Sequence, residues 1–94
     1  NKKRGDTIRI NRPLSPGNMR IYFSYRSQTN ECRFILRPEI EYMTVYLEHT
    51  QTHIIYSGEV YADEPVMYQP LDCGVYHITC ITDDGSTYAG EVII

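Results

Sequence analysis

Leu71-Asp72-Cys73-Gly74-Val75-Tyr76-His77-Ile78-Thr79-Cys80 is the stretch that decides the fold. Gly74 closes a turn, and the side chains after it alternate between two faces. One face takes Tyr76, Ile78 and Cys80, and the other takes Val75, His77, Thr79 and Ile81. Alternation with period two among β-branched residues is typical of a strand that buries one face. The pattern therefore predicts a strand that begins after Gly74.

The spacing Asp72-x-Gly74-x-Tyr76-x-Ile78 resembles the tyrosine corner of immunoglobulin-like sandwiches. In that corner the Tyr hydroxyl bonds a backbone group of the preceding loop. An antibody domain has Cys two residues after the Tyr, where this chain has Ile78. The alternative is a Tyr in an ordinary hairpin, but strand-like segments on both sides favour the corner.

Alternating segments separated by turn signals fill the rest of the chain. They predict strands at 19–25, 32–37, 42–49, 53–61 (with a bulge near Gly58), 66–69 and 88–94, and hairpin turns at 27–30 and 83–86. With the strand after Gly74, these make an all-β, seven-stranded immunoglobulin-like antiparallel β-sandwich. Expected inward positions are Met19, Ile21, Phe23, Tyr25, Cys32, Phe34, Leu36, Met43, Val45, Leu47, Tyr88, Gly90, Val92 and Ile94.

The length of 94 residues suits a single domain, 1–94. We expect a basic N-terminal arm, 1–17, with a short edge strand at 7–10, followed by the core sandwich, 18–94. Nine Tyr and no Trp favour strands over helices. No apolar run approaches the roughly 20 residues of a transmembrane span, so no transmembrane segment is predicted.

Charge is divided unevenly along the chain. Residues 1–40 hold all nine Lys and Arg with three acidic residues, while residues 41–94 hold nine acidic residues and no Lys or Arg. The net charge of −3 thus combines +6 and −9. The overall acidity and the lack of a recognised motif argue against a nucleic-acid partner.

The last fifty residues carry Val45-x-Leu47, Val60-Tyr61, Leu71-x-x-Gly74-x-Tyr76-x-Ile78 and Asp84-Gly85-x-x-Tyr88-x-Gly90-x-Val92-x-Ile94. This order resembles small Ig-like domains of unknown function from secreted proteins of gut-dwelling Gram-negative anaerobes of the Bacteroides type. It also resembles C-terminal sandwich modules of secreted bacterial enzymes and adhesins. The resemblance implies an exported sandwich with no established activity, and it transfers no catalytic residues.

The three cysteines leave three arrangements open: no bridge, Cys32–Cys73, or Cys32–Cys80. An odd count leaves at least one thiol without an intramolecular partner. A nucleophilic Cys is not expected, because thiols in a strand core are inert.

Candidate metal ligands are few. His49 and His53 flank a turn without a third ligand, and we interpret them as solvated surface histidines. Asp83-Asp84-Gly85 lacks the further oxygen ligands of a calcium loop, and a hairpin turn accounts for it. We therefore predict no metal and no cofactor.

Two outward faces are candidate surfaces. One sheet is expected to present an apolar patch with polar groups, the candidate contact site for a partner, at Tyr42, Tyr46, His77, Thr79, Ile81 and Ile93. The alternative there is cross-strand pairing that only stabilises the sheet. The other sheet is expected to present a basic face at Arg20, Arg26, Arg33 and Arg37, which is either a solvated face or an anion-binding one.

These features predict a non-enzymatic interaction or spacer module that contacts a protein partner or another copy of itself. The alternative is a carbohydrate-binding module that uses Tyr42, Tyr46 and His77. The start at Asn1-Lys2-Lys3-Arg4, without Met, leads us to expect an exported protein (periplasmic, cell-surface or secreted) whose signal peptide has been removed.

Overall fold

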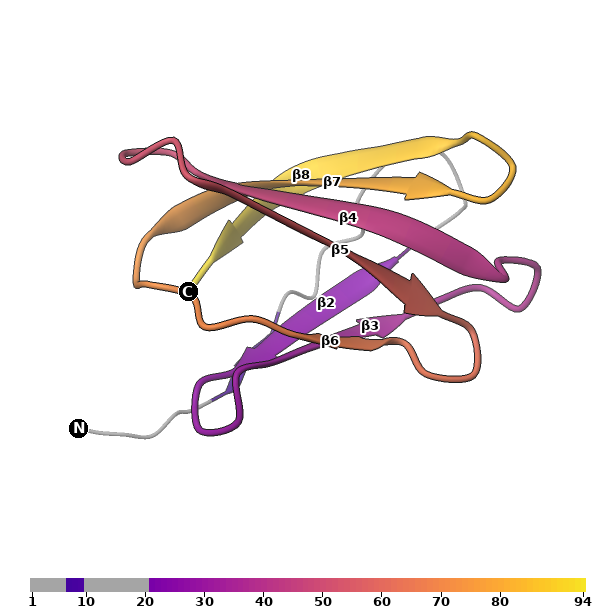
Figure 1. Cartoon of the computed structure of the whole chain (residues 1–94), viewed down its shortest axis with the longest axis horizontal. Helices are drawn as coiled ribbons and strands as arrows, with labels where there is room; N and C mark the ends of the chain where they lie inside the picture. Colours follow the sequence, from indigo (N-terminus) through magenta and orange to yellow (C-terminus); the bar gives the residue numbers. More distant parts are fainter. Residues whose placement is uncertain (1–6, 10–20) are drawn as a thin grey trace.

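The computed structural model describes residues 7–9 and 21–94, with side chains from residue 21 onward. This part of the chain folds into two antiparallel β-sheets that face each other, as Figure 1 shows. It contains no helix long and apolar enough to cross a membrane. The prediction of an all-β, two-layer sandwich is confirmed. Met19, Arg20 and most of the basic arm expected at 1–17 lie outside the described residues.

The first sheet has the order β1-β2-β3-β6 and the second the order β5-β4-β7-β8. Seven of these strands follow residue 20, and the short β1 extends the edge of the first sheet. The first sheet comprises β1 (Thr7–Arg9), β2 (Tyr22–Arg26), β3 (Glu31–Ile35) and β6 (Val66–Tyr68). The second comprises β5 (Ile55–Tyr61), β4 (Tyr42–His49), β7 (Val75–Thr82) and β8 (Thr87–Ile93).

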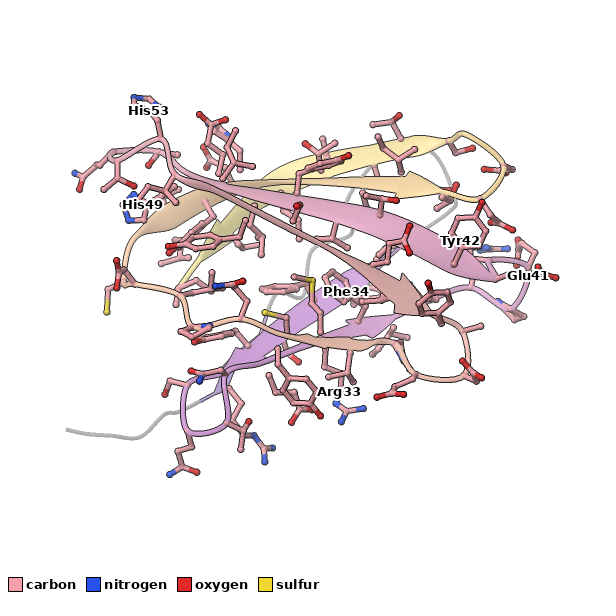
Figure 2. The ribbon with its side chains drawn as sticks, in the orientation of Figure 1. Arg33, Phe34, Glu41, Tyr42, His49 and His53 are labelled. Carbon is pink, nitrogen blue, oxygen red and sulfur yellow. The ribbon has the colours of Figure 1, made fainter. Side chains whose placement is uncertain are left out.

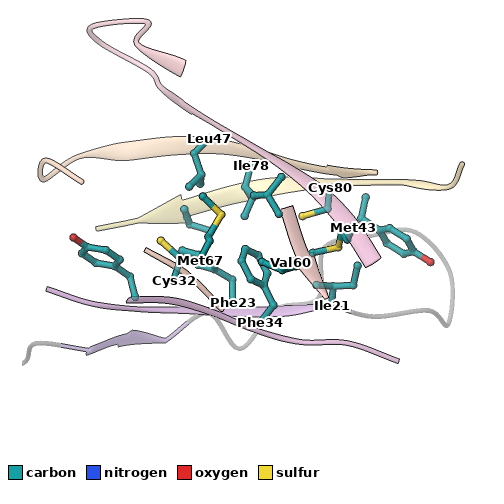
Figure 3. Close-up of a cluster of buried hydrophobic side chains, with 14 of the residues drawn as sticks. Ile21, Phe23, Cys32, Phe34, Met43, Leu47, Val60, Met67, Ile78 and Cys80 are labelled. Carbon is teal, nitrogen blue, oxygen red and sulfur yellow. The ribbon is translucent and has the colours of Figure 1, made fainter. Parts of the chain in front are cut away.

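The core lies between the sheets and is built mostly from the alternate side chains that the sequence assigns inward (Figure 3), joined by Ile40, Val60 and Met67, which were not among the expected inward positions. Phe23 and Phe34 face each other across β2 and β3 with ring centroids 5.1 Å apart. Leu36 and Ile94 are partly buried and pack on the edge of this core. Burying each large apolar side chain contributes roughly 1.5–3 kcal/mol, so the core drives the two sheets together.

The strand 55–61 differs from its prediction in two ways. It begins at Ile55 rather than at His53, whose φ of +63° leaves the extended region. The bulge expected near Gly58 is absent, because the pairing with β4 runs without a break from Tyr42↔Tyr61 to Glu48↔Ile55. Gly58 instead makes room for Met67 from the other sheet: a Cβ there would lie 2.9 Å from the Met67 methyl carbon.

The tyrosine corner is confirmed. The fully buried Tyr76 donates a hydrogen bond from its hydroxyl to the carbonyl oxygen of Asp72, 2.8 Å away. Burial, the largest cause, raises the pKa of Tyr76 to about 12. A second tyrosine, from the other sheet, binds the same loop: the Leu71 N–H donates to the hydroxyl of Tyr25 at 3.1 Å. The segment that leads into β7 is thus held by both layers of the sandwich.

All three cysteines are free thiols, so neither Cys32–Cys73 nor Cys32–Cys80 forms. Cys32 and Cys80 lie in the core, and burial raises the pKa of each thiol to about 12. Cys73 is exposed in the corner. The two core thiols therefore act as small apolar side chains.

Candidate interaction surface

The six predicted contact residues all lie on the solvent side of the second sheet, which we call the outer face. Their alternation with buried neighbours places them there, since successive side chains of a strand point to opposite faces. The outer face carries Tyr42 and Tyr46 on β4, His77, Thr79 and Ile81 on β7, and Ile93 on β8.

The centre of the outer face is a compact group of three of these residues. On β7, Thr79 lies directly opposite Tyr46. Ile81, which lies opposite Thr44, is the diagonal neighbour of Tyr46. Tyr46 is 40% exposed and Ile81 37%. Such neighbours contact each other across an antiparallel pair. The structure therefore brings Tyr46, Thr79 and Ile81 together.

The remaining residues lie toward the ends of the sheet. Tyr42 lies where β4 begins, and its carbonyl accepts a hydrogen bond from the Asp83 N–H at 3.1 Å. Ile93 lies opposite Val75, at the other end of β7. Eight residues of extended chain separate these ends, about 26 Å at 3.3 Å per residue. Figure 2 shows Tyr42 and His49 at opposite ends of β4. The six residues do not form one compact patch.

The sequence interpretation missed the contribution of β5 to the outer face. Tyr61 lies opposite Tyr42 with ring centroids 6.4 Å apart, and it is 48% exposed. Ile55, at the other end of β5, is also exposed. The short turn between β4 and β5 is the signal that could have identified them, because strands joined by so few residues pair as a hairpin.

The outer face is acidic as well as aromatic. Glu48, Glu59 and Glu91 lie on it, and residues 41–94 contain no Lys or Arg to balance them. The Tyr61 hydroxyl donates to Glu59 Oε1 at 2.8 Å, and this hydrogen bond raises the pKa of Tyr61. His77 lies between Glu48 on β4 and Glu91 on β8. A cationic partner would therefore meet carboxylates around the aromatic rings.

Glutamates accompany the arginines of the first sheet. Arg33 Nε donates to Glu31 Oε2 at 2.6 Å, and Arg37 Nε donates to Glu39 Oε2 at 3.0 Å. Arg26 is exposed and lies opposite Glu31. Figure 2 shows Arg33 pointing away from the core. The basic face thus carries less net charge than its arginines alone indicate, and Arg20 lies outside the described residues.

His49 is not the solvated surface histidine that the sequence indicated. It is 5% exposed, and its ring packs edge-on against Tyr76 with centroids 4.9 Å apart. Its Nδ1 accepts the N–H groups of Gln51 and Thr52 at 3.1 and 3.3 Å. Since a nitrogen that accepts N–H groups carries no proton, Nε2 holds the proton and donates to Cys73 O at 3.0 Å. His49 is a structural residue, whereas His53 and His77 are exposed.

The turn Asp83-Asp84-Gly85 behaves as the predicted hairpin. Asp84 Oδ1 accepts hydrogen bonds from the Thr82 hydroxyl at 2.5 Å and from the Ser86 N–H at 3.0 Å. These bonds, the Thr82 one first, lower the pKa of Asp84. Across residues 7–9 and 21–94, His, Cys, Asp and Glu side chains form no group of three that could hold a metal ion.

Comparison with known proteins gives no match: no family model, no curated protein and no solved structure is similar to this chain.

Proposed function

We propose that this chain is an exported, non-enzymatic immunoglobulin-like module that contacts a protein through its outer face. The immunoglobulin-like assignment is supported by the tyrosine corner at the start of β7 and by the strand order. The sheet β4-β7-β8 corresponds to strands C, F and G, with β5 added beside C as in variable-type domains. Export is supported by the resemblance of the corner and of the last hairpin to modules of secreted proteins.

The observation that carries the contact proposal is the adjoining group Tyr46, Thr79 and Ile81, in which Tyr46 and Ile81 are exposed and Thr79 is half-buried. It combines an aromatic ring and an aliphatic side chain with hydroxyl groups, and Tyr is enriched in the centres of protein interfaces. The carboxylates around it favour a partner with a basic surface. A second copy offers such a surface, because its first sheet exposes Arg26 and Arg33.

Light scattering over a range of concentrations and salt tests this proposal with the chain alone. We expect association that weakens as salt rises, because contact between opposite charges is screened. Tyr46→Glu should reduce it at least tenfold. Ile54→Glu, which adds the same charge at a side chain 48% exposed in the turn between β4 and β5 and outside both sheets, is the control. Equal effects of the two variants would place the contact elsewhere.

Carbohydrate binding is the second candidate, and the tilted pair Tyr42–Tyr61 favours it. Two exposed rings at one end of the sheet could stack on the apolar face of a sugar, and Tyr46, four residues along β4, would supply a polar contact. His77 lies opposite Glu48, about 20 Å along the sheet from Tyr42 at 3.3 Å per residue, so the sugar contact predicted for His77 does not fit this pair. A glycan array distinguishes the two functions. Binding of a defined glycan that is lost in Tyr42→Ala and Tyr61→Ala supports this candidate and counts against a protein partner.

A further inference from the structure

The outer edge of β5 is an open strand edge whose backbone groups can be assigned. The His49 N–H bonds Ile54 O at 3.0 Å, and the Ala62 N–H bonds Glu41 O at 2.9 Å. In an antiparallel pair, residues bond the neighbouring strand alternately. Because the register is unbroken, the even-numbered residues of β5 form backbone hydrogen bonds with β4. The odd-numbered residues point their N–H and C=O groups away from β4.

Three odd residues keep these groups available for another strand: Ile55, Ser57 and Glu59. Tyr61, the fourth, exchanges backbone hydrogen bonds with Glu64. Among the strands in residues 7–9 and 21–94, only β4 pairs with β5. Exposed edges are usually protected by Lys, Pro, a bulge or very short length. β5 has seven residues, no Lys, Arg or Pro, and no bulge.

We propose that β5 pairs antiparallel with β5 of a second copy, about a twofold axis at Ser57, to form one continuous sheet. This register sets Ser57 opposite Ser57 and Ile55 opposite Glu59. It uses all three free residues on each copy, for up to about six backbone hydrogen bonds. The contact uses the backbone edge of β5, although the side chains of these residues lie on the outer face, and it does not depend on a partner binding there.

Charge and backbone geometry select this register. A slip of two residues in one direction sets Ile55 opposite Tyr61, whose backbone groups already bond Glu64. A slip of four in that direction brings Glu59 opposite Glu59, and directly facing like charges are destabilising. A slip of two in the other direction sets Glu59 opposite His53, whose φ of +63° is not extended. Only the register centred on Ser57 pairs all three free residues of each copy.

The inner side of the strand is also self-complementary in this register. Tyr56 of each copy, which packs against its own core, lies opposite Gly58 of the other, a residue with no side chain of its own. Below Gly58 lies the thioether of Met67, whose sulfur would be 3.2 Å from a Cβ at that position. An aromatic ring beside an edge glycine and a Met sulfur makes favourable contacts. Because a few residues from each copy pair, the interface falls below about 1,200 Å², the size range of weak complexes.

Cysteine cross-linking tests the register. In a Cys73→Ser background, which removes the exposed native thiol, Ser57→Cys places two thiols on the axis. Facing hydrogen-bonded residues have Cα atoms about 5.5 Å apart, within the range of a disulfide. We expect covalent dimer to form at least tenfold faster for Ser57→Cys than for Glu59→Cys, whose counterpart in the other copy is Ile55. Equal rates, or faster reaction of Glu59→Cys, would overturn the register.

Sedimentation equilibrium up to about 1 mM protein, the weak end of specific affinities, tests the dimer itself. Ser57→Lys, which sets two cations face to face, should raise the dissociation constant at least tenfold. Thr87→Lys, the same change at an exposed position on β8, should leave it unchanged. Dimerisation through backbone groups should also persist in high salt, unlike contact through the outer face. A monomer at all concentrations, or a dimer unaffected by Ser57→Lys, contradicts the proposal.

Discussion

The imidazole of His49 donates a hydrogen bond to the carbonyl oxygen of Cys73, 3.0 Å away and 24 residues later in the chain. Two tyrosines bind the neighbouring backbone groups: Tyr25 accepts the Leu71 N–H, and Tyr76 donates to Asp72 O. Three side chains from three strands thus hold three consecutive residues. The segment crosses between the sheets, where it has no ladder partner, so these side chains satisfy its backbone.

Replacing His49 should destabilise the fold strongly. His49→Ala removes the bond to Cys73, leaves the Gln51 and Thr52 N–H groups without their acceptor, and opens space beside Tyr76. At about 1 kcal/mol for each hydrogen bond, we expect a loss of about 3 kcal/mol in the free energy of unfolding, measured in urea. His53→Ala, at an exposed ring, is the control and should change stability by less than about 0.5 kcal/mol.

The hydrogen-bond geometry also fixes the tautomer of His49. We expect long-range ¹H–¹⁵N spectra to show the ring proton on Nε2 and none on Nδ1. A proton on Nδ1 would contradict the described hydrogen bonds, because that nitrogen could then accept neither N–H group.

Two glycines with positive φ should respond differently to alanine. Gly85 has a φ of +87° and open space around it, so Gly85→Ala should cost about 1–2 kcal/mol for the backbone alone. Gly74 has a φ of +141°, and a Cβ there would clash with Nε2 of the His49 ring and lie 3.0 Å from its Cε1. Gly74→Ala should therefore cost clearly more than Gly85→Ala in urea unfolding. Equal costs would mean that His49 does not pack against this turn.

The thiols should separate into one reactive and two protected groups. Cys73 is exposed, whereas burial raises the pKa of the Cys32 and Cys80 thiols to about 12. We expect iodoacetamide at pH 8 to add a single label to the folded protein, at Cys73, and three labels in guanidinium chloride, counted by mass spectrometry. Rapid labelling of Cys80 in the folded state would contradict the packing of β7.

Stability should fall in alkaline solution. The folded-state pKa of Cys32, Cys80 and Tyr76 is about 12, above the ordinary values of 9.0 and 10.0. A raised folded-state pKa contributes stability that is complete below the unfolded value and is lost as pH rises toward the folded one. The free energy of unfolding should therefore decline from about pH 9 to pH 12, by at most about 1.4 kcal/mol per pH unit for each group. Cys80→Ala should make the free energy of unfolding decline less steeply with pH. An unchanged slope would contradict the contribution assigned to the buried Cys80 thiol.

Features decided by neighbours in sequence could be predicted. The corner at Tyr76, the hairpin at Asp84 and the inward positions of the strands follow from local spacing, and the structure confirms them. The role of His49 could not be predicted, because its partner lies 24 residues away in another loop. The prediction of a bulge near Gly58 is wrong. The small size of Gly58 is required by Met67, which belongs to the opposite sheet.

The candidate surface, likewise, could be predicted only in part. Alternation placed Tyr46, Thr79 and Ile81 on one side of their strands, but only the register shows that they adjoin while Ile93 lies at the far end. The pairing of Tyr61 with Tyr42 required knowing which sheet β5 joins.

The central claim, that the outer face is the contact surface, is tested most directly by following backbone amides of ¹⁵N-labelled protein through a dilution series. If the face contacts another copy, amides at Tyr46, Thr79 and Ile81 should shift with concentration, and added salt should diminish the shifts. If these three amides keep their positions while shifts appear elsewhere or nowhere, the outer face makes no such contact and the claim is contradicted.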